Sequence, residues 1–197
     1  MNGQTSKNKL AAYWGFERVT AWVWFSNLVI NFLPDLWIIN RYVRPALARF
    51  MGLRCGPGAM LEKDVFYGDT RHITLGTKVH LCRKVFLDAS RPITIGNHVS
   101  IAFQVTLITS SHEFGPAEQR EGAPTGAPIV IEDGVWIAAR AIVGPGAIVG
   151  AGSVISAGAA LMHSIPPNSL VAGVPARVIK RLDAGTPAVP PPHAAAN

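Results

Sequence analysis

The side chain best suited to acid–base chemistry in this sequence is His112. Histidine can accept and return a proton near neutral pH, because its ordinary pKa lies there. The chain has six histidines, and His193 lies close to the C-terminus. Three more fall within a regular repeat, where they are expected at surface turns: His72, His80 and His98. A lone histidine is more often structural than catalytic, but His112 lies in "SSHEFG", inside the long segment that interrupts the repeat. His112 is therefore the candidate general base.

Two carboxylates could fix the orientation of this imidazole. Asp88 lies in "FLDAS", and Glu113 directly follows the histidine. Neighbouring residues of an extended segment point to opposite sides, which disfavours Glu113 without excluding it. Both carboxylates are kept as candidate catalytic residues beside His112.

A six-residue repeat supplies the elements that position these side chains. The segment 135–161, "VWIAARAIVGPGAIVGAGSVISAGAAL", is apolar but carries too many glycines, and a proline, for a stable helix. A branched aliphatic residue instead returns at every sixth position: Ile131, Ile137, Val143, Val149, Ile155 and Leu161. The fourth residue after each is small or apolar: Val135, Ala141, Ala147, Ser153, Ala159 and Ile165.

The same period runs through the first half of the chain, where it restarts with similar phrases. These are "HITLG" at 72–76, "PITIG" at 92–96 and "PIVIE" at 128–132. Each hexad holds a short strand and a turn, so three hexads close one triangular coil, with Gly, Asn or Asp in the turns. A β-sandwich would not keep this register over so many hexads. The pattern predicts an all-β chain, a parallel β-helix.

The hexad pattern also divides the chain. Residues 108–128 show no hexads, and a long loop within a compact repeat is usually functional, so this inserted loop is interpreted as the active-site loop. We expect an N-terminal helical cap over 1–52, the β-helix domain over 53–182 and a short disordered tail over 183–197.

The segment before the coils is predicted to form two apolar helices divided at Pro34. Its uncharged run, 19–34, is shorter than the roughly 20 residues that cross a bilayer. The helices are expected to cover the open end of the β-helix. A peripheral membrane contact is compatible with this role, because the segment also carries interfacial residues: Trp14, Trp22, Trp24, Trp37, Arg41, Arg44 and Arg49.

Composition favours one globular domain of 197 residues, 49% of them hydrophobic and 15% charged. The net charge is +6, but the basic residues are scattered and not interleaved with aromatics, so no nucleic-acid partner is expected. Cys55 and Cys82 are too few for a disulfide framework and lack a metal-ligand spacing. These features indicate a reducing compartment, the cytoplasm.

The motifs together resemble a known family. The hexads, "SSHEFG" and the run containing "VWI", "GAGSVI" and "IPPNSLVAGVPARVIK" resemble the hexapeptide-repeat acyltransferases, particularly the maltose, galactoside and colanic-acid O-acetyltransferases. The resemblance covers about 55–182. It implies a left-handed β-helix, against the usual right-handed crossover rule. It also implies a homotrimer with acetyl-CoA in the groove between neighbouring prisms, and transfer of acetyl to a hydroxyl of a sugar, glycan or glycoside.

The resemblance also assigns roles to residues. His112 matches the catalytic histidine, and Asp88 matches an acidic position that contacts the acceptor. The implied cofactor-binding positions are Trp136, Ala138, Ala139, Ala157, His163, Arg177 and Lys180, the last being part of the basic pair near the CoA phosphates. Ala138 replaces the glycine usual after "VWI", and the acceptor-binding asparagine of the sugar enzymes has no counterpart near 81–83.

Acetyl transfer from a thioester to a hydroxyl needs a base for the hydroxyl proton and donors for the oxyanion. His112 would be the base, and the backbone N–H groups near Ala138 and Ala139 would form the oxyanion site. Three alternatives stay open: transfer to the amino group of an amino sugar, a metal-dependent hydratase of the carbonic-anhydrase type, and a non-catalytic scaffold. No metal is expected, because no two histidines occupy matching hexad positions in neighbouring coils.

Overall fold

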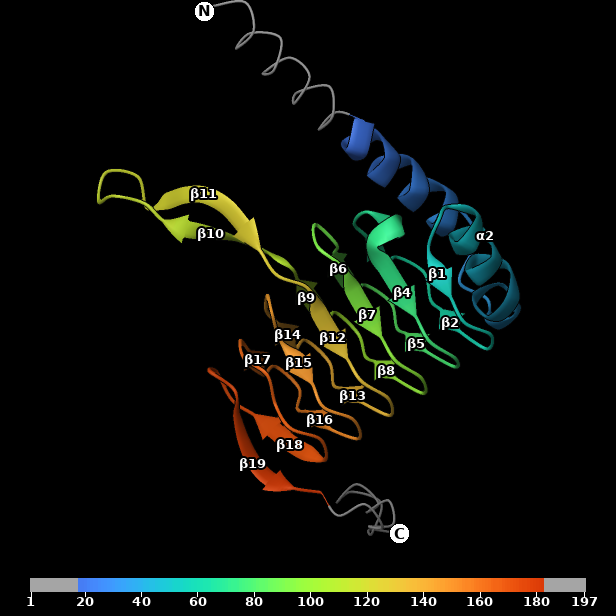
Figure 1. Ribbon diagram of the computed structural model, residues 1–197. Helices are drawn as coiled ribbons and strands as arrows, with labels where there is room; N and C mark the ends of the chain where they lie inside the picture. Colours follow the sequence, from blue (N-terminus) through green and yellow to red (C-terminus); the bar gives the residue numbers. More distant parts are fainter. Residues whose placement is uncertain (1–17, 183–197) are drawn as a thin grey trace, which may run out of the picture.

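The protein folds into a three-sided parallel β-helix, as the hexad period predicts. The computed structural model describes residues 18–182, and Figure 1 shows short strands stacked coil upon coil, with helices at one end. The first sheet holds β1 (Arg54–Cys55), β4 (Ile73–Leu75), β7 (Ile93–Ile95), β12 (Ile129–Ile131) and β15 (Ile148–Val149). The third sheet holds β3 (Phe66–Tyr67), β6 (Phe86–Asp88), β9 (Thr106–Ile108), β14 (Ile142–Val143) and β17 (Ala160–Leu161).

The second sheet is the longest and closes the C-terminal end. It holds β2 (Met60–Leu61), β5 (His80–Leu81), β8 (Ser100–Ile101), β13 (Trp136–Ile137), β16 (Val154–Ile155), β18 (Ser169–Ala172) and β19 (Arg177–Arg181). All these strands pair in parallel except β19, which folds back antiparallel onto β18. The predicted tail 183–197, with His193, lies outside the described residues.

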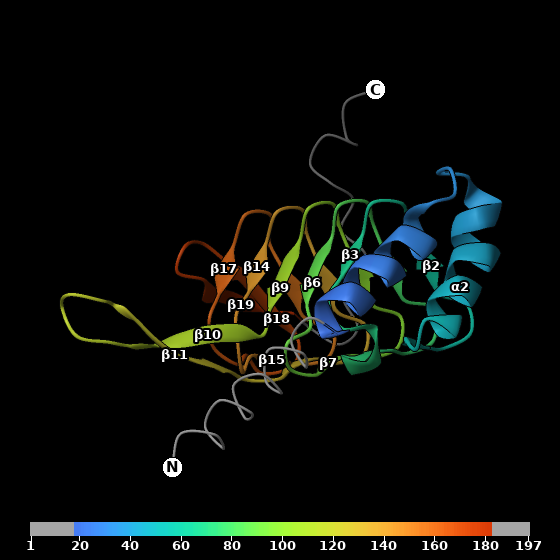
Figure 2. The ribbon, with the colours of Figure 1, turned by 90° about the horizontal axis from the view of Figure 1, so that it is seen from above.

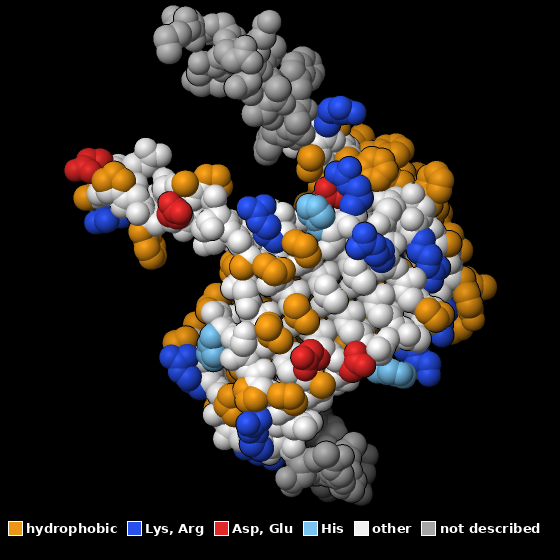
Figure 3. All heavy atoms as spheres, in the orientation of Figure 1, with side chains coloured by type: hydrophobic (Ala, Val, Ile, Leu, Met, Phe, Trp, Pro, Cys, Tyr) orange, Lys and Arg blue, Asp and Glu red, His pale blue; other side chains and the backbone are white. Residues whose placement is uncertain are grey.

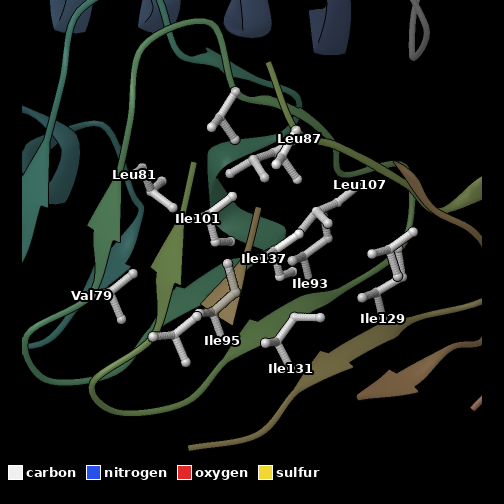
Figure 4. Close-up of a cluster of buried hydrophobic side chains, with 14 of the residues drawn as sticks. Val79, Leu81, Leu87, Ile93, Ile95, Ile101, Leu107, Ile129, Ile131 and Ile137 are labelled. Atoms are coloured by element: carbon white, nitrogen blue, oxygen red, sulfur yellow. The ribbon is translucent and has the colours of Figure 1, made fainter. Parts of the chain in front are cut away.

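The aliphatic hexad residues fill the interior of this prism. Leu81, Ile101 and Ile137 follow one another through the second sheet, and each has no exposed surface. Smaller residues of the second hexad slot, such as Val79 and Ala141, are buried with them. Figure 4 shows such side chains pointing toward one another from the surrounding strands. Burial of one Leu or Ile side chain contributes about 1.5–3 kcal/mol, so the six-residue period is also the main source of stability.

The turns follow the prediction only in part. Gly134, Gly146, Gly152 and Gly158 take the left-handed conformation, with positive φ, in the C-terminal half of the prism. In other turns this conformation is held by residues with side chains, including Lys78, Lys84, His98, Gln104 and Arg140. The expectation of Gly, Asn or Asp at every turn is therefore wrong. His80 also departs from the expectation, because it lies in β5 and not in a turn.

Two helices cover the N-terminal end of the prism (Figure 2). The first is described over residues 18–31, and the second runs over 37–50, through a π-helical turn (Ile39–Val43) into α2 (Arg44–Phe50). Ile30 and Met51 join the buried core, which confirms the helical cap over the described residues. Within 18–182 no helix is long and apolar enough to cross a membrane.

Buried Arg44 ties both helices to the first coil. Its guanidinium group donates hydrogen bonds to the carbonyl oxygens of Ile30 at 3.1 Å, Leu33 at 2.8 Å and Leu61 at 3.2 Å. A buried cation is tolerated when its donors are satisfied in this way. Arg44 is therefore a structural residue of the cap and, unlike the expected interfacial residue, does not face solvent.

The inserted segment forms an arm, and not a loop without secondary structure. We define the arm as β10 (Ser110–Phe114), β11 (Glu121–Gly126) and the residues that join them. The two strands pair antiparallel, with Ser110 opposite Gly126, and project away from the prism (Figure 1). The hairpin carries little hydrophobic alternation because its side chains are exposed or half-exposed, which explains why the pattern predicts only an interruption.

Candidate active site

His112 lies on the arm in an orientation set by the backbone. Its Nδ1 lies 3.2 Å from the carbonyl oxygen of Gly122 on β11. A carbonyl can only accept, so this contact assigns the hydrogen to Nδ1 and leaves the lone pair of the neutral ring on Nε2. Nε2 lies 3.2 Å from an Oε1 of Glu121, which can pair with the ring once it gains a proton. The imidazole is about 44% exposed, so an acceptor can reach it.

Neither carboxylate expected from the sequence holds this ring. Among the described residues, the partners of the His112 imidazole are Gly122 and Glu121, and not Asp88 or Glu113. Glu113 belongs to the same strand, β10, where adjacent side chains point to opposite sides. A backbone carbonyl carries no signal in the sequence, which is why sequence reasoning missed Gly122.

Asp88 instead fixes the base of the arm. Its Oδ2 accepts hydrogen bonds from the hydroxyl and, at 2.9 Å, the backbone N–H of Ser110. Its Oδ1 accepts a hydrogen bond of 2.7 Å from the hydroxyl of Ser90. Burial raises the pKa of Asp88, but these hydrogen bonds outweigh it and hold the pKa below its usual value. A charged Asp88 therefore positions the first residue of β10, two residues before His112.

A cavity of about 580 Å³ opens beside Asp88, between the third sheet and the first helix. Phe66 and Phe86 form part of its wall, with parallel rings whose centroids are 4.6 Å apart. Asp88, Ser90 and His72 supply polar groups, and the helix contributes Val19 and Val23. Sequence analysis missed this cavity, although the twenty-residue spacing of the two phenylalanines could have indicated their stacking.

Trp136 and Lys180 share one row on the outer face of the second sheet. Trp136 is paired with Val154, Val154 with Leu170, and Leu170 with Lys180. Adjacent strands lie about 4.8 Å apart, so Lys180 stands roughly 14 Å from Trp136. Trp136 is 52% exposed, and Arg177 lies on the same strand as Lys180. An exposed indole on the middle strand, β13, and two cations on the edge strand, β19, thus lie on one sheet.

Ala139 and Ala157 occupy stacked turns between the second and third sheets, where Gly158 N–H donates to the Ala139 carbonyl at 2.9 Å. Ala138 N–H is already donated to the Ile155 carbonyl at 2.8 Å. Of the two amides expected to form an oxyanion site, only that of Ala139 has no acceptor among residues 18–182. The expected role of the Ala138 amide is therefore wrong in this geometry.

His163 lies at the opposite edge of the third sheet, in the exposed turn after β17. The predicted cofactor-binding residues are therefore divided between two edges of the prism. His112 stands on a third structure, the arm. One chain thus places Trp136, Arg177 and Lys180 on the second sheet. It places Ala139 and Ala157 at one corner of the prism. Neither group lies beside His163 or His112 within the same chain.

Comparisons with known proteins agree with this architecture. Residues 128–162 match the family model described as bacterial transferase hexapeptide (six repeats). The chain is 32% identical to the galactoside O-acetyltransferase of Escherichia coli K12 over 140 residues, covering 71% of this chain and 69% of the relative. It is 33% identical to nodulation protein L of Rhizobium meliloti over 159 residues, covering 80% and 82%.

A solved structure of a galactoside acetyltransferase in complex with coenzyme A matches with a TM-score of 0.72 at 27% identity. The match covers 84% of this chain and 82% of that one. These matches support the left-handed β-helix that the resemblance implies. The chain belongs to the family of hexapeptide-repeat acetyltransferases.

Proposed function

We propose that this protein transfers the acetyl group of acetyl-CoA to a hydroxyl group of a sugar, glycan or glycoside. The observation that carries the proposal is the orientation of His112: its Nδ1–H is held by the Gly122 carbonyl, so the lone pair of the neutral ring lies on Nε2, beside Glu121, and can accept a proton. Relatives named as galactoside O-acetyltransferases, and a similar structure that contains coenzyme A, supply the donor and the acceptor class.

The reaction proceeds by direct attack. The acceptor hydroxyl loses its proton to His112 Nε2 as its oxygen attacks the thioester carbonyl, and Glu121 then lies beside a protonated ring. The tetrahedral intermediate carries its negative charge on the former carbonyl oxygen, toward which the Ala139 amide could donate. Its collapse breaks the carbon–sulfur bond, and the departing thiolate takes the proton back from His112. The products are the acetyl ester and CoA.

The division of the cofactor-binding residues supports a homotrimer. A groove formed by the second sheet of one chain and the third-sheet edge of its neighbour would place Trp136, Arg177 and Lys180 opposite His163. Light scattering tests this assembly, and the proposal requires three times the 21.0 kDa mass of the chain. A mass of 21.0 kDa at assay concentration contradicts it.

The cavity beside Asp88 is the proposed acceptor site. The exposed parts of Phe66 and Phe86 offer an apolar face, and Asp88 and Ser90 offer hydrogen-bonding groups at its edge. Membership of an acetyltransferase family favours group transfer over the hydratase and scaffold alternatives. Incubation with acetyl-CoA and a panel of sugars and amino sugars, followed by mass spectrometry, identifies the acceptor. Mild base removes an O-acetyl ester but not an N-acetyl amide, so it separates the two kinds of acceptor.

The protein is proposed to be cytoplasmic and peripherally bound to membranes. Cys55 and Cys82 are both free, as expected in a reducing compartment. Large apolar side chains of the helical cap face solvent: Trp24, Phe25, Leu28, Phe32, Leu36, Trp37, Ile38, Tyr42 and Phe50. Figure 3 shows apolar side chains gathered along this edge, with basic groups beside them. Aromatic and basic side chains together suit an anionic membrane surface.

Sedimentation with lipid vesicles tests this contact. The protein is expected to pellet with vesicles that contain an anionic lipid, and a variant combining Trp37→Ala and Phe50→Ala is expected to stay in the supernatant. Phe114→Ala is the matched control, because Phe114 is an aromatic residue that is 97% exposed on the arm. A wild-type protein that remains in the supernatant with these vesicles contradicts the membrane contact.

A further inference from the structure

Three potential metal ligands converge on the second sheet, close to the helical cap. His80 Nε2 lies 2.9 Å from Glu62 Oε1 and 3.8 Å from Cys82 Sγ. The ligand atoms of the three residues all lie within 4.8 Å of one another. Glu62 follows β2, while His80 and Cys82 stand on and directly after β5, the neighbouring strand (Figure 1). The cluster therefore belongs to the first two coils and not to the arm.

The coil geometry explains this convergence. Glu62 and Cys82 are equivalent positions of successive coils, twenty residues apart, and the backbone N–H of Glu62 donates to the carbonyl of Leu81. His80 and Cys82 are two residues apart, so both side chains leave the same side of the extended backbone. All three residues are half-buried, which shields the cluster without closing it.

A cysteine–histidine nucleophile is the alternative explanation, and the geometry opposes it. In a catalytic triad the nucleophile and the carboxylate contact opposite nitrogens of the imidazole. Here the Glu62 carboxylate and the Cys82 thiol both lie at Nε2 of His80.

We propose that Glu62, His80 and Cys82 bind a zinc ion. One thiolate, one imidazole nitrogen and one carboxylate oxygen form a ligand set that suits Zn²⁺, with water as the fourth ligand. The second oxygen of Glu62 is already held, since Oε2 accepts a hydrogen bond of 3.1 Å from the Arg83 backbone N–H. Such a contact orients the carboxylate so that Oε1 faces the ion. The sequence expectation of no metal considered the histidines and the spacing of the two cysteines separately and did not weigh this mixed set.

Zinc at this site would join two coils at the end of the prism where the cap begins. Binding would replace the proton of the Cys82 thiol with the ion. The site is separate from the proposed reaction, which needs neither Glu62 nor Cys82. Binding therefore predicts a rise in melting temperature and no requirement of zinc for acetyl transfer.

Cobalt titration of the metal-free full chain tests the proposal. Wild type and Cys55→Ser are expected to bind one equivalent of Co²⁺ with a thiolate-to-cobalt absorption band, which Zn²⁺ then abolishes by displacement. Cys82→Ser is expected to lose the band. Cys55 is a matched control, because it is also half-buried with its pKa raised by burial, but its Sγ faces the Gly56 carbonyl. Absence of the band in wild type, or its loss in Cys55→Ser alone, overturns the proposal.

Protection of the thiol gives a second measurement that does not depend on the colour of cobalt. In the Cys55→Ser variant only Cys82 can be alkylated, and Zn²⁺ is expected to slow its reaction and to raise the melting temperature. In a variant combining Cys55→Ser and His80→Ala, the melting temperature without metal shows that the chain is folded, and both effects of Zn²⁺ are expected to disappear. Equal alkylation rates with and without Zn²⁺ in folded Cys55→Ser contradict the site.

Discussion

The arm and the prism differ in what holds them together. Interior strands of the prism pair with a neighbour on each side and bury aliphatic side chains, whereas β10 and β11 pair only with each other. The candidate base His112 lies on the arm, and most of the candidate cofactor-binding residues lie on the prism or its C-terminal hairpin. The proposed general base and the stabilising core therefore lie in separate regions, so substitutions are expected to damage one and spare the other.

The largest expected loss of stability comes from the prism. Ile137→Ala removes a side chain with no exposed surface and should cost about 2–5 kcal/mol of unfolding free energy. Phe114→Ala on the arm removes a larger side chain that is 97% exposed and should cost less than about 0.5 kcal/mol. Denaturant unfolding of both variants measures the contrast. Equal losses would show that the arm and the prism are one cooperative packing unit.

The hydrogen bonds between Asp88 and Ser110, which link the prism to the arm, should affect activity more than stability. Asp88→Ala removes the acceptor of the Ser110 and Ser90 hydrogen bonds, so His112 loses its fixed position and kcat should fall about tenfold to a hundredfold. Asp88→Asn keeps the shape and part of the hydrogen bonding and should lose less. Steady-state kinetics with melting temperatures checks both variants. An unchanged kcat in Asp88→Ala would show that Asp88 does not position His112.

Acid should weaken the same contact between Asp88 and Ser110. The folded-state pKa of Asp88 is lowered, so its stabilising contribution is present above the unfolded value, about 3.9, and is lost as pH falls through the lower folded value. Cleavage within 109–127 by an acid-active protease should therefore increase below about pH 4. In Asp88→Asn this pH dependence should be absent. Cleavage that rises equally in the Asn variant assigns the acid effect to other groups.

On the prism, Arg177→Ala should weaken cofactor binding and spare the chemical step. Removal of one cation near the proposed phosphate site should raise the KM for acetyl-CoA several-fold, with kcat almost unchanged. Arg54→Ala is the control, because Arg54 is an exposed arginine on β1 near the opposite end of the prism. A fall in kcat alone, or an equal effect in both variants, would place Arg177 outside the cofactor site.

The smallest effect is expected at Glu121. Its contact with His112 Nε2 is exposed, with 72% of the Glu121 side chain accessible, and exposed ion pairs contribute little. Glu121→Gln should therefore lower kcat less than about threefold, and added salt should reduce the difference between the two proteins further. A loss as large as that of a general base would give Glu121 a direct role in proton transfer.

The prism was predictable from the sequence, and the arrangement around His112 was not. A residue at each sixth position, such as Ile137 or Ile155, must point inward in any coil built of hexads, so the period alone predicts the stacking and the core. The arm has no buried face, so "SSHEFG" carries no alternation from which a hairpin could be inferred. The Gly122 carbonyl that orients the imidazole could not be predicted, because every residue has a carbonyl. The twenty-residue offset could have predicted that Glu62 and Cys82 lie next to each other. The metal site would have followed only if His80, two residues before Cys82, had been considered with them.

The kinetics of His112→Ala test the central claim most directly. With acetyl-CoA and an identified acceptor, kcat should fall by about 10²–10⁴-fold, the usual contribution of a general base. The KM for acetyl-CoA and the melting temperature should stay at their wild-type values, because the residue lies on the exposed arm and outside the proposed cofactor groove. Turnover close to wild type, or a joint loss of folding and cofactor binding, would contradict His112 as the base.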